Sequence, residues 1–421
     1  MTSVSEFDPL FVHASARSGS TYIFSVLRRG ASLICFNEAI IDGKLDYADF
    51  GLASDKAPSD QDSQSQPQGW DVNHHFLDRE DYGEFIDAWG EVMHLCPEFP
   101  TFLDYLPPHG VLRADLVAYL AALMKYARVR NKRPALCEIN SRGRAGALRG
   151  TFGGYHIAQY RNPLSQFGSF VRPLIEGGTW GFLSHPVTEL GVNSAHPLYR
   201  VVPEQWRAPN FPWRADTRAR RWGSDARYIA ATASDRPDAA ERLFRWHLFS
   251  WALNNLVAVA YSDLSLDVDK AHDDAGYRAS VVTALAPQIG GEPDFSDIRK
   301  FDRYYDFESF DMAEVCDQVV SAVKGALSDG RLDTAIRGLG SAPPVTPTAA
   351  AAELLLTKIG ESLASMQSSS GRRRISASEW KDLAVKNRKL WHNSGVRWVA
   401  ERVYPLAAPL GRMVRRAGIP I

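Results

Sequence analysis

Cysteine is scarce in this chain of 421 residues, which has four. They lack the spacing of a metal site or a disulfide framework, and Cys35 and Cys137 lie in apolar runs typical of core thiols. Long apolar runs are also missing: none approaches the ~18 residues of a membrane-spanning helix, and no secretory leader opens the sequence. These absences predict a protein of the reducing cytoplasm without a membrane anchor.

Net charge is small as well, at −1, which argues against a general nucleic-acid binder. The charge is unevenly distributed, however. From residue 372 onward twelve Lys and Arg stand against three Asp and Glu, about +9, so the first 371 residues carry about −10. The basic end could close over a polyanionic ligand or meet an anionic partner. Its last part, 396–416, could also lie on a membrane surface or pack on its own domain.

Apolar runs and helical periodicity alternate along most of the chain, which predicts an α/β fold with a mostly parallel central sheet flanked by helices. Strands are expected at 9–15, 32–36, 134–140, 155–160 and 264–268, and helices at 20–29, 82–94, 112–130, 163–171, 238–261, 276–285 and 312–328. The segment 53–69 is expected to be a polar loop. The stretch 178–235 is expected to be an irregular, acceptor-binding region.

A Pro-rich stretch suggests where the main domain ends. The expected organisation is an α/β domain at 1–339, a linker at 340–350 and a basic helical extension at 351–421. No internal repeat is evident in the sequence.

The segment 10–22 is the most informative part of the sequence. An apolar strand pattern ends in a small, hydroxyl-rich turn with one fixed cation, Arg17, and a helix pattern follows. Unpaired amides and the helix dipole converge at such a turn, so it predicts a phosphate-holding loop. It lacks the Lys and the G-x-x-x-x-G-K-[S/T] pattern of nucleoside triphosphatases. A Ser-rich turn with a surface Arg is the alternative.

A second cationic turn follows the expected strand 155–160. Arg161 stands at the strand's C-terminal end, Pro163 suits a first helical position, and Ser169 follows eight residues after the Arg. Ligands of open α/β sheets bind at the carboxyl ends of strands, where an Arg can bind a phosphate in a forked geometry.

Together the two segments, RSGSTY at 17–22 and YRNPLSQFGS at 160–169, resemble the 5′-phosphosulfate loop and the 3′-phosphate motif of sulfotransferases that use 3′-phosphoadenosine-5′-phosphosulfate (PAPS). The resemblance implies the P-loop-like fold of that family and PAPS as co-substrate, with no metal. Carried over position by position, it implies a donor site formed by Arg17, Ser18, Gly19, Ser20, Thr21, Tyr22, Arg161 and Ser169. Tyr22 would stack on adenine, or belong to the core.

A third segment, RRISASEWKD at 373–382, is similar to the late basic motif of cytosolic sulfotransferases. The resemblance implies that Arg373 and Arg374 grip the 3′-phosphate. The two Gly positions of the motif are Ile375 and Ser378 here, which removes the close backbone approach that Gly permits. A solvated basic turn before a helix is the alternative.

Sulfuryl transfer to a hydroxyl requires a cation at the leaving phosphate and a base at the acceptor oxygen. Arg17 would supply the charge. Glu38, after the second expected strand, is the first candidate for the base, with a surface acid as the alternative. Glu138 is the second, or else a buried partner of Arg142 or Arg144, which could themselves touch the sulfate or form a basic surface.

The sequence therefore predicts a PAPS-dependent sulfotransferase with a carbohydrate or glycoconjugate acceptor, because aromatic and polar side chains gather between 179 and 227. Small-molecule acceptors such as phenols and lipids remain open. So do two other functions: a kinase or nucleotide-sugar enzyme, and a nucleotide-binding protein without catalysis.

Overall fold

The structure is a computed structural model that describes residues 8–40, 79–97, 105–177, 183–208, 238–300 and 303–392. The expected loop at 53–69, the tail at 396–416 and the segment 209–237 lie outside these residues.

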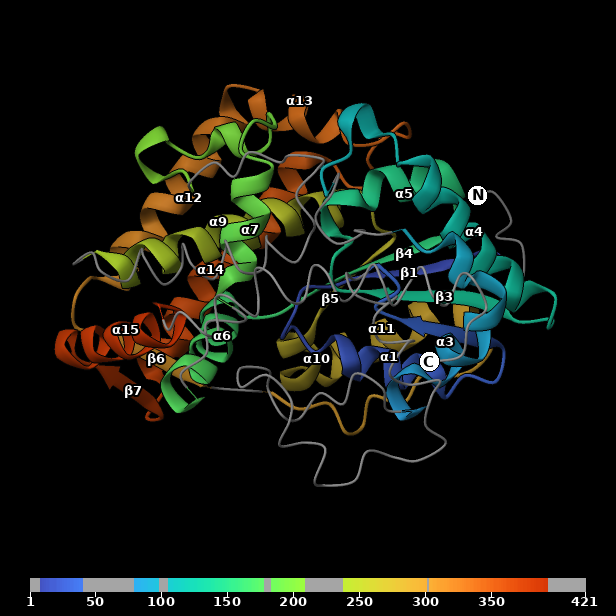
Figure 1. Cartoon of the computed structure of the whole chain (residues 1–421), viewed down its shortest axis with the longest axis horizontal. Helices are drawn as coiled ribbons and strands as arrows, with labels where there is room; N and C mark the ends of the chain where they lie inside the picture. The colour runs from blue at the N-terminus through green and yellow to red at the C-terminus, as the bar shows by residue number, and fades with distance from the viewer. Residues whose placement is uncertain are drawn as a thin grey trace.

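Five parallel strands form the central sheet, in the order β2-β3-β1-β4-β5 (Figure 1). They are β1 (Leu10–His13), β2 (Leu33–Asn37), β3 (Arg133–Glu138), β4 (Tyr155–Tyr160) and β5 (Leu264–Asp267). The central strand β1 places His13 between Glu138 of β3 and Ala158 of β4. The predicted α/β class with a parallel sheet flanked by helices is confirmed.

Helices cover both faces of this sheet. They are α1 (Ser20–Arg28), α3 (Arg79–Val92), α4 (Ala114–Arg128), α5 (Ala145–Phe152), α6 (Pro163–Gly177), α7 (Ser184–Val192), α9 (Ala239–Ala260), α10 (Val268–Asp273), α11 (Ala275–Ile289), α12 (Met312–Ser328), α13 (Arg331–Arg337), α14 (Thr348–Ser368) and α15 (Ala377–His392). Side chains alternate along each strand, so Leu10 and Val12 pack toward α1, α10 and α11, whereas Phe11 packs toward α3, α4 and α5.

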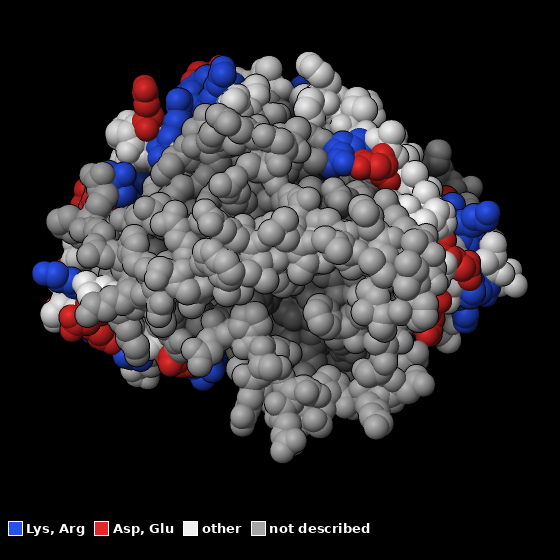
Figure 2. Space-filling view, viewed as in Figure 1, with Lys and Arg blue, Asp and Glu red and all other residues white. Residues whose placement is uncertain are grey.

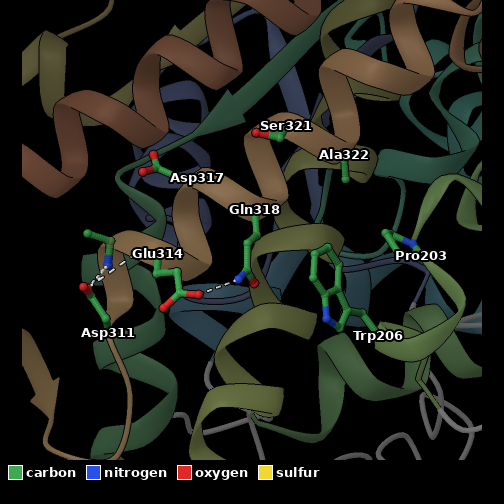
Figure 3. A pocket seen from close by; sticks show the side chains of 9 residues that line it. Pro203, Trp206, Asp311, Glu314, Asp317, Gln318, Ser321 and Ala322 are labelled. Carbon is green, nitrogen blue, oxygen red and sulfur yellow. Dashed lines mark hydrogen bonds between the residues drawn. The ribbon is translucent and has the colours of Figure 1, made fainter.

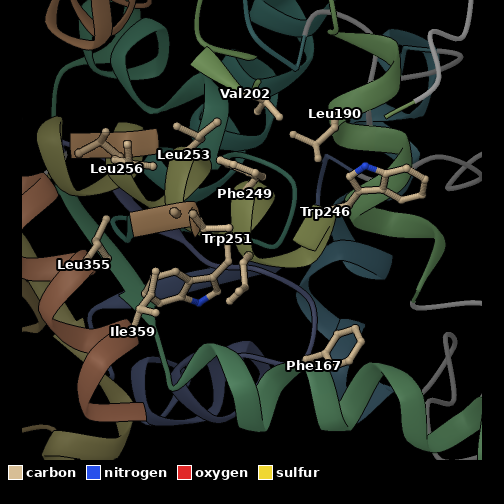
Figure 4. Packing of buried hydrophobic residues seen from close by; sticks show 14 of the residues in the cluster. Phe167, Leu190, Val202, Trp246, Phe249, Trp251, Leu253, Leu256, Leu355 and Ile359 are labelled. Carbon is tan, nitrogen blue, oxygen red and sulfur yellow. The ribbon is translucent and has the colours of Figure 1, made fainter. Parts of the chain in front are cut away.

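The largest core cluster surrounds α9, which is buried along almost its whole length and packs against α7, α12 and α14 (Figure 4). Leu355 and Ile359 bring α14 into this cluster. Helix α14 begins at Thr348, inside the range expected to be a linker. Residues 348–366 thus share their core with the α/β domain.

Two short strands were not predicted. β6 (Tyr304–Phe307) pairs in parallel with β7 (Arg372–Ile375) and forms a second sheet beside α6. Residues 183–208, the described part of the region expected to be irregular, form α7 and two short 3-10 helices, and their apolar side chains join the main core.

None of the helices within the described ranges combines the length and hydropathy that crossing a bilayer requires. On the face shown in Figure 2, the described Lys and Arg side chains lie beside Asp and Glu around the rim, so neither sign dominates there.

Two fully buried histidines on neighbouring strands, His13 of β1 and His156 of β4, are linked by hydrogen bonds. His156 Nε2 bonds the carbonyl of Gly153 at 2.8 Å, and its Nδ1 lies 2.9 Å from His13 Nε2. Because a carbonyl only accepts, Nε2 of His156 carries the proton, His13 donates to His156, and Ser141 donates to His13 over 2.8 Å. This arrangement is that of two neutral rings, and burial, which lowers the pKa of both histidines, favours it.

We expect the free energy of unfolding to decrease as the pH is lowered from about 7.5 to about 5. Burial lowers the pKa of His13 well below its usual range, that of His156 to about 4 and that of His247 to about 3. The unfolded chain takes up protons on these rings near pH 6.5, whereas the folded chain does not, so protonation favours unfolding. Urea unfolding at several pH values checks this, and a constant free energy over the interval would contradict it.

Candidate functional site

The loop between β1 and α1 turns through two left-handed residues. Arg17 has φ 62° and Gly19, the N-cap of α1, has φ 88°. Glycine adopts this conformation freely, whereas for Arg17 it costs roughly 1–2 kcal/mol. A sharp, partly strained turn thus leads into the helix N-terminus, as the sequence predicts, and that this loop holds a phosphate stays a prediction.

Three consecutive carbonyls of this loop are held by side chains from β4 and α6. Gln166 Nε2 donates to Ala16 O at 2.6 Å, Arg161 Nη1 to Arg17 O at 3.0 Å, and Gln159 Nε2 to Ser18 O at 3.0 Å. All three donors are buried. The two cationic turns of the sequence therefore meet in one structure, and two glutamines that the sequence analysis missed complete it.

These bonds also set the direction of the loop amides. In a trans peptide the carbonyl of one residue points opposite to the N–H of the next. Since the carbonyls of residues 16–18 point toward β4 and α6, the amides of Arg17 and Gly19 point away from them, and the first turn of α1 adds amides without intrahelical acceptors. Such a set of amides forms a concavity suited to an anion.

The side chain of Ser18 points inward. Its Oγ donates to the carbonyl of Ser15 at 2.7 Å, and the residue is fully buried. The hydroxyl of Ser18 therefore stabilises the turn, because its proton is donated to the backbone of the loop. Thr21 remains partly accessible at the start of α1.

Arg161 contacts a different serine from the one expected. Its Nη2 donates to Ser165 Oγ on the first turn of α6. Ser169 lies one turn further, half-buried, and donates to the carbonyl of Ser165 at 3.3 Å. The two serines share a face of α6, and Ser165 is the one that orients the guanidinium.

A buried ionic network fixes the turn after β4. The amide of Asn162 donates to Asp269 Oδ2, and its side-chain Oδ1 accepts from the amides of Leu164 and Ser165, which caps α6. Lys358 of α14 pairs with Asp267 at 2.8 Å and with Asp269 at 3.3 Å. Burial disfavours the charge on Lys358, but the two carboxylates outweigh this and raise its pKa above the usual value.

The site lies where the connections of the sheet diverge. After β1 the chain enters α1 on one face, whereas after β3 and β4 it enters α5 and α6 on the other. A crevice forms at such a switch point, outside the carboxyl ends of the strands. Arg17 and Arg161 follow two neighbouring strands, β1 and β4, at this edge of the sheet.

The two candidate bases follow the neighbouring strands on the β2 side. Glu38 comes directly after β2, is half-buried and has φ 51°, a second strained turn at this edge. Glu138 ends β3 and is 1 % exposed, and its Oε2 accepts from the amide of Ile40 at 2.9 Å. Glu138 thus orders the turn that holds Glu38. Adjacent strands are ~4.8 Å apart, so the ends of β2 and β1, which precede Glu38 and the Arg17 loop, are about 10 Å apart.

The cations after β3 are buried, so of the two alternatives for Arg142 and Arg144 the basic surface is wrong. Arg142 is 3 % exposed, and its Nη2 lies 3.0 Å from Glu189 Oε1. Arg144 is fully buried and donates to the carbonyl of Asn140 at 2.7 Å. Glu189 of α7, which the sequence analysis did not consider, is the ionic partner of Arg142.

The remaining candidates lie further out. Tyr22 is half-buried on α1, and its hydroxyl donates to Asp297 at 3.0 Å. Burial, and after it this hydrogen bond, raises the pKa of Tyr22. Arg373 and Arg374 are exposed on β7, where they pair with Glu379 at 2.6 Å and Glu308 at 3.1 Å. Their sheet reaches the site through β6, since Asn162 Nδ2 donates to Tyr304 OH at 3.0 Å.

A hollow of about 740 Å³ at the described surface contains none of these residues. Figure 3 shows it between Trp206 and the start of α12, where Glu314 accepts from Gln318. Among the described residues no group of three His, Cys, Asp or Glu is placed to hold a metal ion.

Comparison of this chain with known proteins finds no matching family model, curated protein or solved structure.

Replacing Lys358 by Met should lower the free energy of unfolding by about 3–5 kcal/mol, because it leaves two buried carboxylates without their cation. Urea denaturation measures the change. Lys324→Met, on the exposed side of α12, is the matched control and should stay within about 0.5 kcal/mol. Equal effects of the two substitutions would contradict the role of the network.

Proposed function

We propose that this protein is a PAPS-dependent sulfotransferase that moves a sulfuryl group to an acceptor hydroxyl, with the P-loop-like fold of that family. One observation supports this above all: Arg161, after β4, donates at 3.0 Å to the carbonyl of Arg17 in the loop after β1. Two cationic turns at one crevice suit a ligand with phosphates at both ends of an adenosine.

The residues around the proposed PAPS site then have distinct roles. The loop amides and the Arg17 guanidinium face the 5′-phosphate and stabilise the charge that builds on it when the bond from its bridging oxygen to sulfur breaks. Arg17 stays charged throughout, so it acts by electrostatics and not as a proton donor. Arg161, with Ser165 and Ser169 on α6, is assigned to the 3′-phosphate.

The acceptor oxygen forms the new bond to sulfur and must lose its proton. Glu38 is the proposed base, because it is accessible at the carboxyl edge of the sheet and Glu138 holds the backbone of its turn. The sulfated acceptor and adenosine 3′,5′-bisphosphate are the products, and the proton remains on the carboxyl group until release.

Isothermal calorimetry tests the nucleotide specificity of the purified full chain. Sulfotransferase function predicts tight binding of adenosine 3′,5′-bisphosphate and indifference to ATP with magnesium. Preference for ATP with magnesium would point to a kinase-like transferase instead. Transfer of labelled sulfate to a panel of glycan, phenolic and lipid acceptors then identifies the acceptor.

Replacing the two arginines should separate turnover from binding. We expect Arg17→Ala to lower kcat by about 10²–10³-fold and to weaken bisphosphate binding by less than tenfold. Arg161→Ala should weaken that binding by about 10–100-fold, since it removes a charged contact of about 1.5–3 kcal/mol and a carbonyl clamp. The control, Arg128→Ala at the exposed end of α4, should alter neither quantity. The reverse pattern would show that the two roles are misassigned.

Replacing the Glu38 carboxylate by a carboxamide tests the proton transfer separately from donor binding. Glu38→Gln should lower kcat by about 10²–10⁴-fold and leave the affinity for adenosine 3′,5′-bisphosphate unchanged, because only the base is lost. Single-turnover transfer of labelled sulfate measures the step. An unchanged rate would remove Glu38 from the mechanism, and absence of transfer to any acceptor in the unmodified protein would favour nucleotide binding without catalysis.

A further inference from the structure

A small cavity lies on the α7 and α9 side of the β1–α1 loop. Ser15 and Ala16 line it from the loop, Gln166 from α6, Glu189 from α7, and Trp251 from α9, with Arg142 entering from the turn after β3. Its free volume is about 10 Å³, which is the space of one water-sized group. The cavity therefore takes a single oxygen-sized group.

Glu189 anchors the wall of this cavity. Its carboxylate accepts from Arg142 Nη2 at 3.0 Å and from Asn254 Nδ2 at 3.0 Å, and also from the hydroxyl of Ser250. Tyr199 donates to Asn254 Oδ1 at 2.6 Å and extends the network. These bonds fix the guanidinium of Arg142 in one orientation.

Three buried polar atoms of the lining residues have no hydrogen-bond partner within the described ranges: Arg142 Nε, Trp251 Nε1 and Gln166 Oε1. The three side chains are 1–3 % exposed. Because the Nε2 atom of Gln166 donates to the carbonyl of Ala16, its Oε1 atom is the free acceptor. Buried polar atoms of this kind require a partner, since leaving one unpaired costs about 1–3 kcal/mol.

Two donors and one acceptor match a hydroxyl group, whose oxygen accepts two hydrogen bonds and whose proton is donated once. A sulfate oxygen does not match, because it has no proton for Gln166. We propose that this cavity is a recognition site for one hydroxyl group of the acceptor, an inference that rests on the proposed sulfotransferase function.

The hydroxyl held there is not the one that reacts. Its proton goes to a neutral amide oxygen, and Gln166 cannot keep a proton as a base would. The acceptor must therefore carry at least one further hydroxyl, which meets the sulfuryl group. This selects polyhydroxylated acceptors, such as sugars, over molecules with a single hydroxyl.

The cavity and the proposed PAPS site share residues and lie next to each other. Gln166 both lines the cavity and clamps Ala16, the residue before Arg17. His247, which also lines the cavity, bonds the carbonyl of Pro163 at 2.9 Å, two residues after Arg161. A hydroxyl bound here therefore adjoins the loop proposed to hold the phosphosulfate.

Nuclear magnetic resonance of the unmodified protein labelled on its tryptophan indoles tests the site directly. Titration with free monosaccharides in the presence of adenosine 3′,5′-bisphosphate should shift the Trp251 indole N–H signal in a saturable way. The Trp246 signal is the internal control, because its N–H already donates to Trp206 O at 2.9 Å and its ring leaves α9 in another direction (Figure 4). Betaine, an osmolyte without a hydroxyl, should shift neither signal.

A Trp251 signal that no sugar shifts would mean that the cavity holds only a structural water, and would overturn the proposal. The titration uses the native sequence, so it decides the question even when a variant misfolds. Its failure is also distinct from failure of the proposed function, which would appear as absent binding of adenosine 3′,5′-bisphosphate in calorimetry.

Trp251→Phe provides the kinetic counterpart, since it removes the donor and keeps an aromatic ring. The KM of a sugar acceptor should rise about 3–10-fold, the equivalent of one neutral hydrogen bond, while the KM of a phenol with a single hydroxyl stays the same. Trp246→Phe on the same helix should change neither value. Equal changes for both acceptor types would show that Trp251 acts through packing alone and would overturn the proposal.

Discussion

The clamp on the loop after β1 is the interaction on which the rest of the site depends. Gln159, Arg161 and Gln166 hold three consecutive carbonyls, so the amides of Arg17 and Gly19 point away from β4 and α6. A short loop with two left-handed residues would otherwise sample other conformations, because each such residue costs energy unless its surroundings impose it. The same contacts connect the loop after β1 to β4 and α6, so the conformation of the loop and the sheet stabilise each other.

Buried charge is concentrated around this clamp. Lys358 with Asp267 and Asp269 secures the turn after β4, and Arg142 with Glu189 secures the turn after β3. Pairs of this kind contribute little net stability, but breaking one is costly, so they favour a single arrangement of the groups around them. The carboxyl edge of the sheet is thereby fixed by helices distant in sequence, α7 and α14.

Some elements are determined by local sequence and others are not. The strand 155–160 and the helix 312–328 occur where periodicity predicts them, because each has an apolar pattern and clear end signals. Helix α6 was expected to end at 171, before Pro173, but it continues to Gly177 because the buried side chains of Phe170, Val171 and Leu174 hold it in the core. The strand 372–375, three arginines and an Ile, has no alternation to reveal it and forms only because β6 lies beside it.

The sequence by itself determined the α/β class, the two cationic turns and their position at strand ends, since turn chemistry and periodicity act over a few residues. Only the tertiary structure decided that these turns touch, that Ser18 faces inward, that Ser165 and not Ser169 meets Arg161, and that Arg142 is buried against Glu189. Those outcomes depend on strand order and on which side chains burial brings together. Because a buried polar group must find a partner wherever the fold offers one, the partner can lie far away in the chain, and local patterns do not record it.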